Sequence, residues 1–178
     1  MRDLKIIKPR IFKDDRGYFF ESYNKGVYRD AGIDLTFVQD NQSRSVYGVV
    51  RGLHYQIEPK AQTKLVRVLD GSIWDVAVDL RENSPTFLKW MGVELSSDNY
   101  LQLLIPKGFA HGFSVLSETA VVLYKCDELY APDHEAGIRY DDPDIGVDWK
   151  IEPGNRILSH RDTRMPGVKD ARMNFKYE

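Results

Sequence analysis

Residues 63–80 read TKLVRVLDGSIWDVAVDL, and this stretch indicates two β-strands joined by a tight turn. Asp70-Gly71 is a strong hairpin signal, because the favoured two-residue hairpin turns need positive φ at their centre. Side chains of the second strand alternate between two faces: Trp74, Val76, Val78 and Leu80 on one, and Ile73, Asp75, Ala77 and Asp79 on the other. The face that carries two aspartates fits a polar pocket and a solvated outer face equally well.

Further short strands are expected on both sides of this stretch. Turn residues and apolar patterning predict them at residues 18–22, 87–95, 100–105, 112–116 and 120–129. A short helix is predicted over residues 24–31, capped by Asn24 and closed by Gly32. Many short strands with turns every ~8–12 residues favour a sandwich or a barrel. A small double-sheet roll of this kind leaves its interior free to hold a ligand.

The chain has 178 residues, which suits one domain with a sizeable core. It contains neither a low-complexity linker nor an internal repeat, so a single domain over residues 1–178 is predicted. Within it, residues 1–12 are expected to form an extended N-terminal strand. In residues 143–178, Pro, Gly and Asp recur and interrupt regular secondary structure. These residues are therefore expected to form a C-terminal segment of loops and short helices.

The composition narrows the class of protein. With a net charge of −2, the chain lacks the excess of basic residues that binding to nucleic acid or to an anionic membrane would require. The single cysteine, Cys126, excludes an internal disulfide and a cysteine-rich zinc site. Residues 1–5 carry charges where a signal peptide needs an apolar core, and no apolar run reaches membrane length. We therefore expect a soluble protein of the cytoplasm.

Residues 51–56 read RGLHYQ and place His54 ten positions before Lys64, within a run patterned as β-strand. An imidazole can remove a carbon-bound proton next to a carbonyl, while an ammonium group holds the oxyanion of the resulting enolate. Each residue alone has a plainer interpretation, since a lone histidine is more often structural and a lone strand lysine is usually solvated. The pair indicates enolate chemistry only if the fold brings the two side chains together.

Residues 105–113 read IPKGFAHGF, a Pro-x-Gly-x-x-His turn that runs into a strand and is similar to the second half of the cupin signature. Metal-binding cupins pair this half with two histidines one residue apart, whereas this chain has His54 and Gln56. A metal would have to use His54, Glu58 and His111, which is a poor ligand set for zinc or ferrous iron. We predict no metal site.

Ordered blocks over most of the chain resemble the dTDP-4-dehydrorhamnose 3,5-epimerase family, the dTDP-sugar branch of the cupins. The resemblance runs from about Arg16 to Asp162, and its blocks are FVQDNQSRS at 37–45, GVVRGLHYQ at 48–56, KLVRV at 64–68, DVAVDLR at 75–81, SPTF at 84–87 and IPKGFAHGF at 105–113. It implies a mainly β fold, a cupin-type double-stranded β-helix or jelly roll with short peripheral helices. It also implies a homodimer and no cofactor.

The resemblance implies a role for each of five residues. His54 is the general base and Asp162 supports its charge. Lys64 stabilises the enolate oxygen, and Tyr124 returns a proton from the opposite face of the sugar. Tyr130 stacks on the thymine ring. Taken alone, Tyr124 would be assigned to core packing and Tyr130 to an exposed loop.

The same resemblance implies a set of residues that bind the substrate. Two arginines, Arg16 and Arg51, suit a diphosphate, because a guanidinium group can bind it through two parallel hydrogen bonds. Arg161 stands before Asp162 where many relatives carry a lysine, which keeps the charge but changes the shape. The remaining members are expected to serve the base, the sugar or the ordering of the site: Glu21, Gln39, Asn41, Asp75, His111 and Glu135.

The implied reaction converts dTDP-4-dehydro-6-deoxy-D-glucose to dTDP-4-dehydro-L-rhamnose, for a pathway that feeds surface polysaccharide. Two alternatives stay open. Some relatives epimerise only carbon 5 or only carbon 3 of a modified dTDP-deoxysugar, and they share the catalytic residues. A nucleotide-sugar-binding cupin without catalysis is the alternative from another class. A metal-dependent dioxygenase is disfavoured by the missing second histidine.

Overall fold

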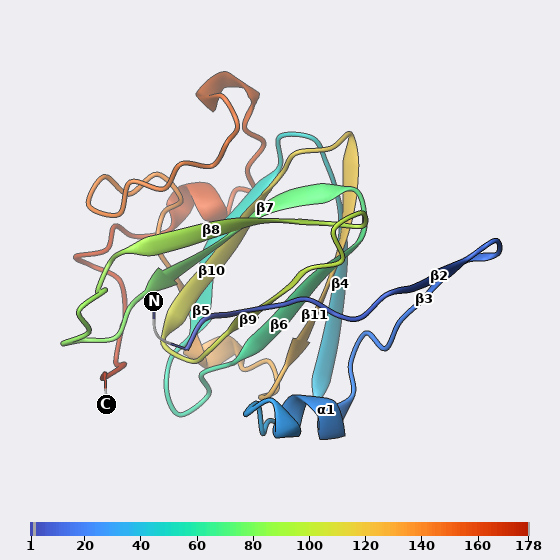
Figure 1. Ribbon diagram of the computed structural model, residues 1–178. Coiled ribbons are helices and arrows are strands. Elements are labelled where there is room, and N and C mark those ends of the chain that lie inside the picture. The colour runs from blue at the N-terminus through green and yellow to red at the C-terminus, as the bar shows by residue number, and fades with distance from the viewer. Residues whose placement is uncertain (2, 178) are drawn as a thin grey trace.

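The computed structural model describes residues 1 and 3–177, and most of its strands belong to two five-stranded antiparallel sheets (Figure 1). The first sheet has the order β1 (Lys5–Ile7), β9 (Gln102–Ile105), β6 (Lys64–Asp70), β11 (Thr119–Cys126) and β4 (Gln39–Val46). The second has the order β12 (Glu135–Gly137), β5 (Val50–Gln56), β10 (Phe109–Val115), β7 (Ser72–Asp79) and β8 (Trp90–Ser96). The two facing sheets confirm the predicted jelly roll.

Short elements lie around this body. β2 (Phe12–Asp14) and β3 (Gly17–Phe19) pair as a hairpin that projects away from the two sheets (Figure 1). The helix α1 (Lys25–Asp30) confirms the predicted cap, because Asn24 Oδ1 accepts hydrogen bonds from Gly26 N at 3.0 Å and Val27 N at 3.3 Å. The described residues also form three 3₁₀ helices, at Pro132–His134, Pro153–Asn155 and Asp162–Arg164. No helix within the described residues is long and apolar enough to cross a membrane.

The predicted hairpin at Asp70-Gly71 is wrong. Gly71 does turn the chain, with φ +76°, but β6 and β7 are not partners. β6 pairs with β9 and β11, while β7 pairs with β8 and β10 in the other sheet. A turn signal predicts a local change of direction, whereas strand pairing is decided by contacts far apart in the sequence. This turn therefore carries the chain from one sheet to the other.

Both faces of β7 are buried, so the solvated interpretation of its aspartate face is also wrong. Val76 and Val78 belong to one apolar cluster, and Ile73 and Ala77 belong to a second cluster that both sheets line. Asp75 shares the face of Ile73 and is completely buried. A carboxylate in this position needs a polar partner to offset its desolvation. That partner is His111, which belongs to the candidate site.

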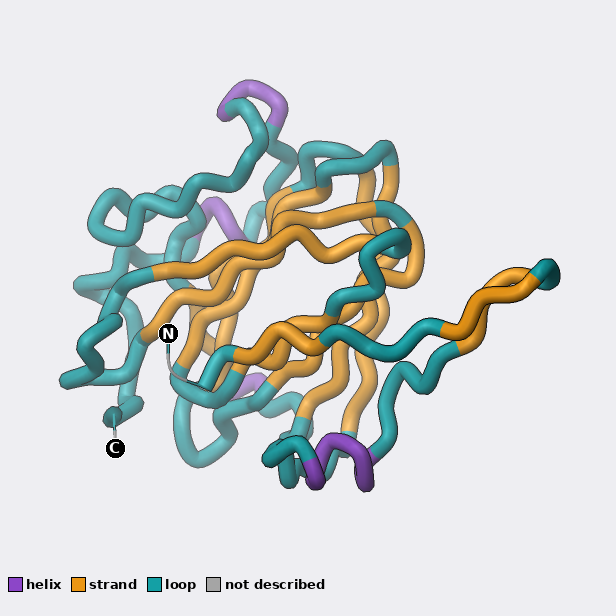
Figure 2. The backbone as a smooth tube through the Cα atoms, in the orientation of Figure 1, coloured by secondary structure: helices purple, strands orange, loops and turns teal. Residues whose placement is uncertain are grey.

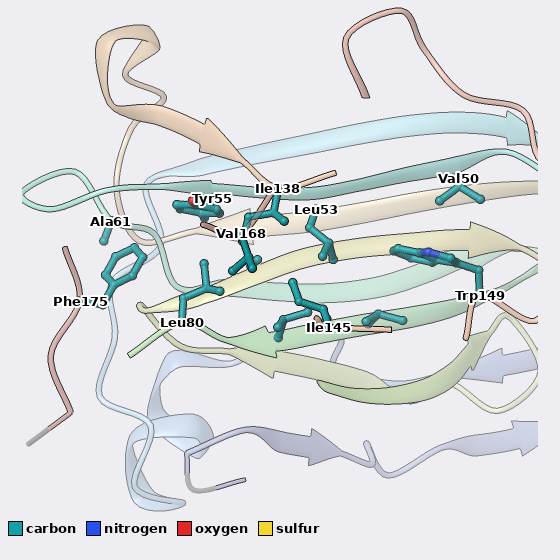
Figure 3. Close-up of a cluster of buried hydrophobic side chains, with 13 residues drawn as sticks. Val50, Leu53, Tyr55, Ala61, Leu80, Ile138, Ile145, Trp149, Val168 and Phe175 are labelled. Carbon is teal, nitrogen blue, oxygen red and sulfur yellow. The ribbon is translucent and has the colours of Figure 1, made fainter. Parts of the chain in front are cut away.

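The C-terminal segment, described over residues 143–177, is mostly loop and packs on the outer face of the second sheet (Figure 2). Trp149, Val168 and Phe175 belong to one apolar cluster with Leu53 of β5 and with Leu80, which directly follows β7 (Figure 3). Full burial of one large apolar side chain stabilises a fold by about 1.5–3 kcal/mol. The segment is thus held by apolar contacts and by two isolated parallel bridges, Val49 with Ile157 and Glu82 with Lys176.

Several predicted boundaries shift. The strand expected at 87–95 begins at Trp90, because residues 84–89 form turns around Asp79. The strand expected at 112–116 begins earlier, at Phe109. The extended segment expected over residues 1–12 contains only the short strand β1 before β2 begins.

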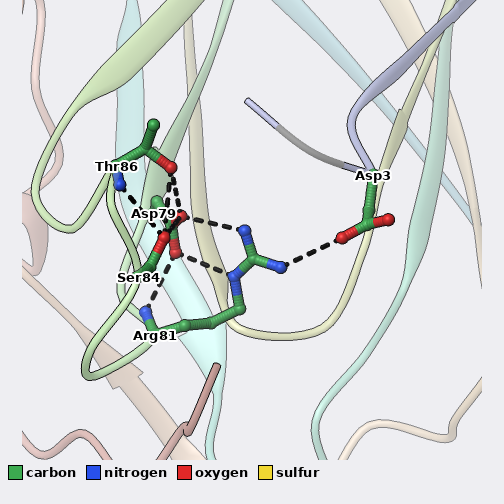
Figure 4. A network of polar contacts seen from close by, with 5 residues as sticks. All are labelled: Asp3, Asp79, Arg81, Ser84 and Thr86. Carbon is green, nitrogen blue, oxygen red and sulfur yellow. Dashed lines mark hydrogen bonds and ion pairs between the residues drawn. The ribbon is translucent and has the colours of Figure 1, made fainter. Parts of the chain in front are cut away.

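A buried carboxylate organises the turn after β7 (Figure 4). Asp79 is fully buried and accepts hydrogen bonds from Arg81 Nε and Nη2, both at 2.9 Å. It also accepts hydrogen bonds from Ser84 Oγ at 2.6 Å and Thr86 Oγ1 at 2.7 Å. Burial by itself raises the pKa of Asp79, but these hydrogen bonds outweigh it and lower the pKa to about 2. Arg81 also donates to Asp3, which ties the N-terminal segment to this turn.

We expect Asp79 to make the fold sensitive to acid. Its pKa is lowered in the folded state, so the unfolded chain takes up a proton first and stability is lost as the pH falls from about 4 through about 2. A shift of this size corresponds to about 2 kcal/mol of unfolding free energy. Chemical denaturation at a series of pH values should show this loss in the wild type and a flatter curve for Asp79→Asn. The exposed Asp98→Asn is the control, and an equally flat curve for it would contradict the assignment.

Candidate active site

A cavity of about 450 Å³ opens between the two sheets. Strands of both sheets contribute to its wall: β4, β6 and β11 from the first, and β5, β10 and β12 from the second. The side chains that line it are Gln39, Asn41, Gln42, Ser43, Arg51, His54, Tyr55, Gln56, Gln62, Lys64, His111, Phe113, Tyr124, Tyr130, Glu135 and Arg161. The cavity holds polar, aromatic and charged groups together, as a site for a polar ligand requires.

A glycine brings the two pocket histidines side by side. Gly52 has φ +139°, and a Cβ built on it would lie 2.6 Å from Gly112 Cα. Only glycine tolerates both the conformation and this close approach. β5 and β10 meet there with an irregular register, in which His54 and His111 are Cα partners. The turn glycine of the RGLHYQ block is thus a residue that positions the histidines.

His54 is held by a carboxylate from the far end of the chain. Its Nε2 lies 2.6 Å from Oδ1 of Asp162, whose other oxygen accepts a hydrogen bond from Ser159 Oγ at 2.7 Å. Burial by itself raises the pKa of Asp162, but the hydrogen bonds from His54 and Ser159 outweigh it and hold the pKa below its usual value. An ionised Asp162 keeps the proton on Nε2, which leaves the lone pair on Nδ1 for a proton from a ligand.

Lys64 and Tyr124 stand on neighbouring strands, with Lys64 Nζ 5.8 Å from the centroid of the tyrosine ring. Burial lowers the pKa of Lys64, and no carboxylate within the described residues lies close enough to form an ion pair with it. Burial raises the pKa of Tyr124, so its hydroxyl stays protonated at neutral pH. The pocket therefore combines an imidazole, a lysine amine that has no ion-pair partner among the described residues, and a protonated phenol.

The second histidine has its own carboxylate. His111 Nε2 lies 2.6 Å from Asp75 Oδ1, and both side chains are buried. Asp75 Oδ2 has no hydrogen-bond partner in the part of the chain described. The His111 ring stands edge-on to the Tyr124 ring, with centroids 6.5 Å apart. Asp75 thus lies behind His111 rather than in the wall of the cavity.

A polar wall closes one side of the cavity. Tyr130 donates its hydroxyl proton to Glu135 Oε2 at 2.7 Å, and Arg161 Nη2 lies 2.5 Å from Glu135 Oε1. Burial raises the pKa of Glu135, but the hydrogen bonds from Arg161 and Tyr130 outweigh it and give a net lowering. Glu135 is therefore an anion that fixes one cation and one aromatic ring at the pocket.

Residues 1–170 match the sequence model of one family, described as dTDP-4-dehydrorhamnose 3,5-epimerase. The chain belongs to the dTDP-4-dehydrorhamnose 3,5-epimerase family. The enzyme of that name from Methanothermobacter thermautotrophicus is 53% identical over 166 residues, which cover 93% of this chain and 89% of the relative. The match confirms the family, and with it the isomerase class, that the resemblance implies.

Solved structures of the 3,5-epimerase family agree with the fold. The crystal structure from Elizabethkingia anophelis has a TM-score of 0.90 at 53% identity and covers 95% of this chain and 93% of its own. The enzyme from Legionella pneumophila, solved in complex with dTDP-4-keto-L-rhamnose, has a TM-score of 0.91 at 48% identity. That match covers 96% of this chain and 90% of the Legionella chain. The cupin-like jelly roll is thus shared with epimerases of known structure.

Within this epimerase the predicted site residues fall into three groups. Most of them line the cavity: Gln39, Asn41, Arg51, His54, Lys64, His111, Tyr124, Tyr130, Glu135 and Arg161. Asp75 and Asp162 stand directly behind the two histidines. The other two, Arg16 and Glu21, lie elsewhere.

Arg16 and Glu21 do not line the cavity of their own chain. Arg16 sits in the turn of the projecting hairpin, where its side chain is 90% exposed and bonded to Asp14 at 2.6 Å. Glu21 accepts a hydrogen bond from Asn24 at the start of α1, at 3.0 Å. Glu21 also lines a separate cavity of its own chain, beside Arg10 and Tyr28. If Arg16 and Glu21 contribute to an active-site cavity, it is the one of another copy of the chain.

Sequence reasoning missed several members of the cavity, and strand alternation would have found three of them. Ser43 lies two residues beyond Asn41, Gln56 two beyond His54, and Phe113 two beyond His111. Side chains two apart on a strand share a face. Glu58, which a metal site would have needed, lines a different cavity beside Arg81 and Lys107. No cluster of metal-ligating side chains occurs within the described residues.

Proposed function

We propose that this protein converts dTDP-4-dehydro-6-deoxy-D-glucose to dTDP-4-dehydro-L-rhamnose, by inverting carbons 3 and 5 of the sugar. One observation carries the proposal: His54, whose Nε2 lies 2.6 Å from Asp162 behind it, lines a single cavity with Lys64 and Tyr124. A 4-keto sugar has acidified C–H bonds on both carbons next to its carbonyl. The pocket supplies the groups that such chemistry needs.

The first step is removal of a proton next to the carbonyl. Neutral His54 accepts it on Nδ1, and the anionic Asp162 stabilises the imidazolium that forms. Negative charge then develops on the carbonyl oxygen, where the Lys64 ammonium group compensates it. Because Lys64 has no ion-pair partner in the part of the chain that the structure describes, its charge is best stabilised when the enolate forms. This interaction favours the transition state more than the bound substrate.

The second step is return of a proton to the opposite face of the same carbon. Tyr124 stays protonated at neutral pH and stands on a different sheet from His54, so it suits this role. Inversion at the second carbon needs only that the ring shift or flip within the cavity. Neither step calls for a redox cofactor or a metal ion.

The proposed substrate contacts follow from the chemistry of the walls. Tyr130 stacks on the thymine ring, while Arg51 and Arg161 face the diphosphate. Arg161 is oriented by Glu135, so the arginine that replaces the usual lysine is already fixed in place. The other predicted contacts, to the base, the sugar or their neighbours, are Gln39, Asn41, Asp75 and His111.

We further propose a homodimer in which Arg16 and Glu21 serve the pocket of the partner copy. The hairpin that carries Arg16 projects from the body (Figure 1). Its strand β3 contains Tyr18 and Phe19, which are 56% and 67% exposed. Exposed aromatic side chains on a projecting arm favour a protein interface. Light scattering should give twice the 20.6 kDa of one chain, and a monomer at micromolar concentration would overturn the proposal.

Residues 1–178 are proposed to act as one cupin-like domain in the cytoplasm. The apolar cluster around Trp149 joins the C-terminal segment to the second sheet, and β1 joins the N-terminal segment to β9. The free, buried Cys126 is compatible with a reducing compartment. Limited proteolysis that released a stable fragment from the native protein would argue for two units instead.

The test of the reaction is NMR of dTDP-4-dehydro-6-deoxyglucose incubated with the protein in deuterated water. Deuterium at both carbon 3 and carbon 5 is the expected result. Deuterium at one carbon only would identify a mono-epimerase of a modified sugar. Binding without any exchange would favour a nucleotide-sugar-binding protein without catalysis.

Tyr124→Phe separates the two proton transfers. Without the hydroxyl, His54 still removes and returns a proton on its own face, so exchange with solvent should persist. Formation of the inverted product should fall by about 10²-fold or more, since a placed proton donor is worth about 10²–10⁴-fold. The same NMR experiment measures both quantities. Tyr28→Phe, a buried tyrosine outside the cavity, is the control, and full inversion by Tyr124→Phe would mean that water donates the proton.

A further inference from the structure

The loop that carries Tyr130 has no regular structure, and side-chain amides hold its backbone. Residues 127–131 belong to neither a helix nor a strand. Gln62 Nε2 donates to Glu128 O at 2.8 Å, and Tyr130 N donates to Gln39 Oε1 at 2.8 Å. Such contacts replace the backbone hydrogen bonds that a strand would provide. The position of Tyr130 therefore depends on glutamines from other parts of the chain.

Gln56 makes the largest share of these contacts. Its Oε1 accepts a hydrogen bond from Ala131 N at 2.8 Å, and its Nε2 donates to Leu129 O at 3.2 Å and to Lys60 O at 2.6 Å. It thus binds the backbone on both sides of Tyr130. Gln56 is only 4% exposed, so water cannot replace these partners if they are lost.

Gln56 also connects this loop to the strand of the proposed base. It lies two residues after His54 on β5, and its Cα is paired with that of Glu135 on β12. Glu135 in turn accepts the Tyr130 hydroxyl proton. The buried Gln56 therefore shares a strand with the proposed base, is paired with Glu135, and binds the backbone on both sides of Tyr130.

We propose that Gln56 is a positioning residue that fixes Tyr130 for the nucleotide and leaves the proton transfers to His54. The inference rests on the proposed function, because it assigns Tyr130 to the thymine ring. Gln56 does not touch the reacting atoms in this role. Its loss should therefore weaken nucleotide binding and raise KM, while kcat at saturating substrate stays close to that of the wild type.

The decisive variants are Gln56→Glu and Gln56→Met. The first keeps the shape but turns both donor contacts into contacts between oxygens, and the second removes all three hydrogen bonds without adding charge. We expect each to raise the Kd for dTDP and the KM by about 10- to 100-fold, from the loss of two or three hydrogen bonds. Calorimetry with dTDP and steady-state kinetics measure these values. A folded variant with wild-type Kd and KM would overturn the inference.

A double-mutant cycle distinguishes positioning from general destabilisation. If Gln56 acts through Tyr130, Gln56→Met should add little to the Kd of Tyr130→Ala, because the side chain it positions is already absent. Fully additive effects would contradict this. Val78→Ala, in the apolar cluster behind the second sheet, should lower the melting temperature without changing the Kd.

Measurements of dTDP binding and of proton exchange with the wild-type protein distinguish failure of this inference from failure of the proposed function. Wild type that neither binds dTDP nor exchanges sugar protons would overturn both. Wild type that does both, beside Gln56 variants with unchanged Kd and KM, would overturn only the positioning role.

Discussion

His54→Asn is expected to lower kcat by about 10²–10⁴-fold, the usual contribution of a placed general base. Asparagine reaches only to about the position of Nδ1, so it loses the Nε2 contact with Asp162, and its amide cannot accept a proton from carbon. The fold should survive, because His54 is not part of an apolar cluster and its side chain is 30% exposed. Steady-state kinetics with the 4-keto sugar nucleotide measures the loss.

The same substitution should abolish solvent exchange as well as inversion, in contrast to Tyr124→Phe. His134→Asn provides a matched control, because His134 lies in a 3₁₀ helix outside the cavity. Near wild-type turnover by His54→Asn would remove His54 from the mechanism. Loss of turnover with retained deuterium exchange would instead assign the first proton transfer to another group.

Lys64→Met is expected to lower kcat by about 10²–10³-fold, the typical cost of removing one group that stabilises an oxyanion. Methionine has nearly the length of the lysine chain, so it fills the same space between the strands without the charge. The Kd for dTDP should change little, because Lys64 acts on the sugar carbonyl rather than on the nucleotide. Kinetics and calorimetry together test this separation.

Lys125→Met is the matched control for Lys64. Lys125 follows Tyr124 on β11, points to the opposite face of the strand, and pairs with Asp40 at 2.9 Å. Its loss should leave kcat unchanged. Equal effects of the two substitutions would show that general electrostatics, rather than a contact with the enolate, explains the loss.

Local patterns predicted the parts of this fold that depend on local physics. The cap of α1 at Asn24 and the alternation of β7 follow from hydrogen bonds and side-chain periods that neighbouring residues determine. The pairing of β6 and β7 could not be predicted in the same way. Asp70-Gly71 suits a hairpin, but contacts with β10 and β11 decide which sheet each strand joins.

The candidate site shows the same division. Strand alternation alone places His54 and Gln56 on one face, yet it says nothing of Asp162, which lies 108 residues away. Only the family resemblance pointed to that pair. Arg16 shows the reverse case, since the resemblance assigned it to the substrate but the chain places it on an arm outside its own pocket. Which pocket it serves depends on an assembly that one sequence does not describe.

The docking of the C-terminal segment links completion of the chain to activity. All strands of both sheets have been made once Gly137 is in place, yet His54 has no carboxylate until Ser159 and Asp162 follow. A chain shortened or cut before Ser159 loses the carboxylate that contacts His54, and losing Trp149 as well uncovers the apolar face of the second sheet. Exposed apolar surface favours chaperone capture and proteolysis in cells. The C-terminal segment thus combines two contacts: its apolar side chains cover the second sheet, and its Asp162 holds the imidazole of His54.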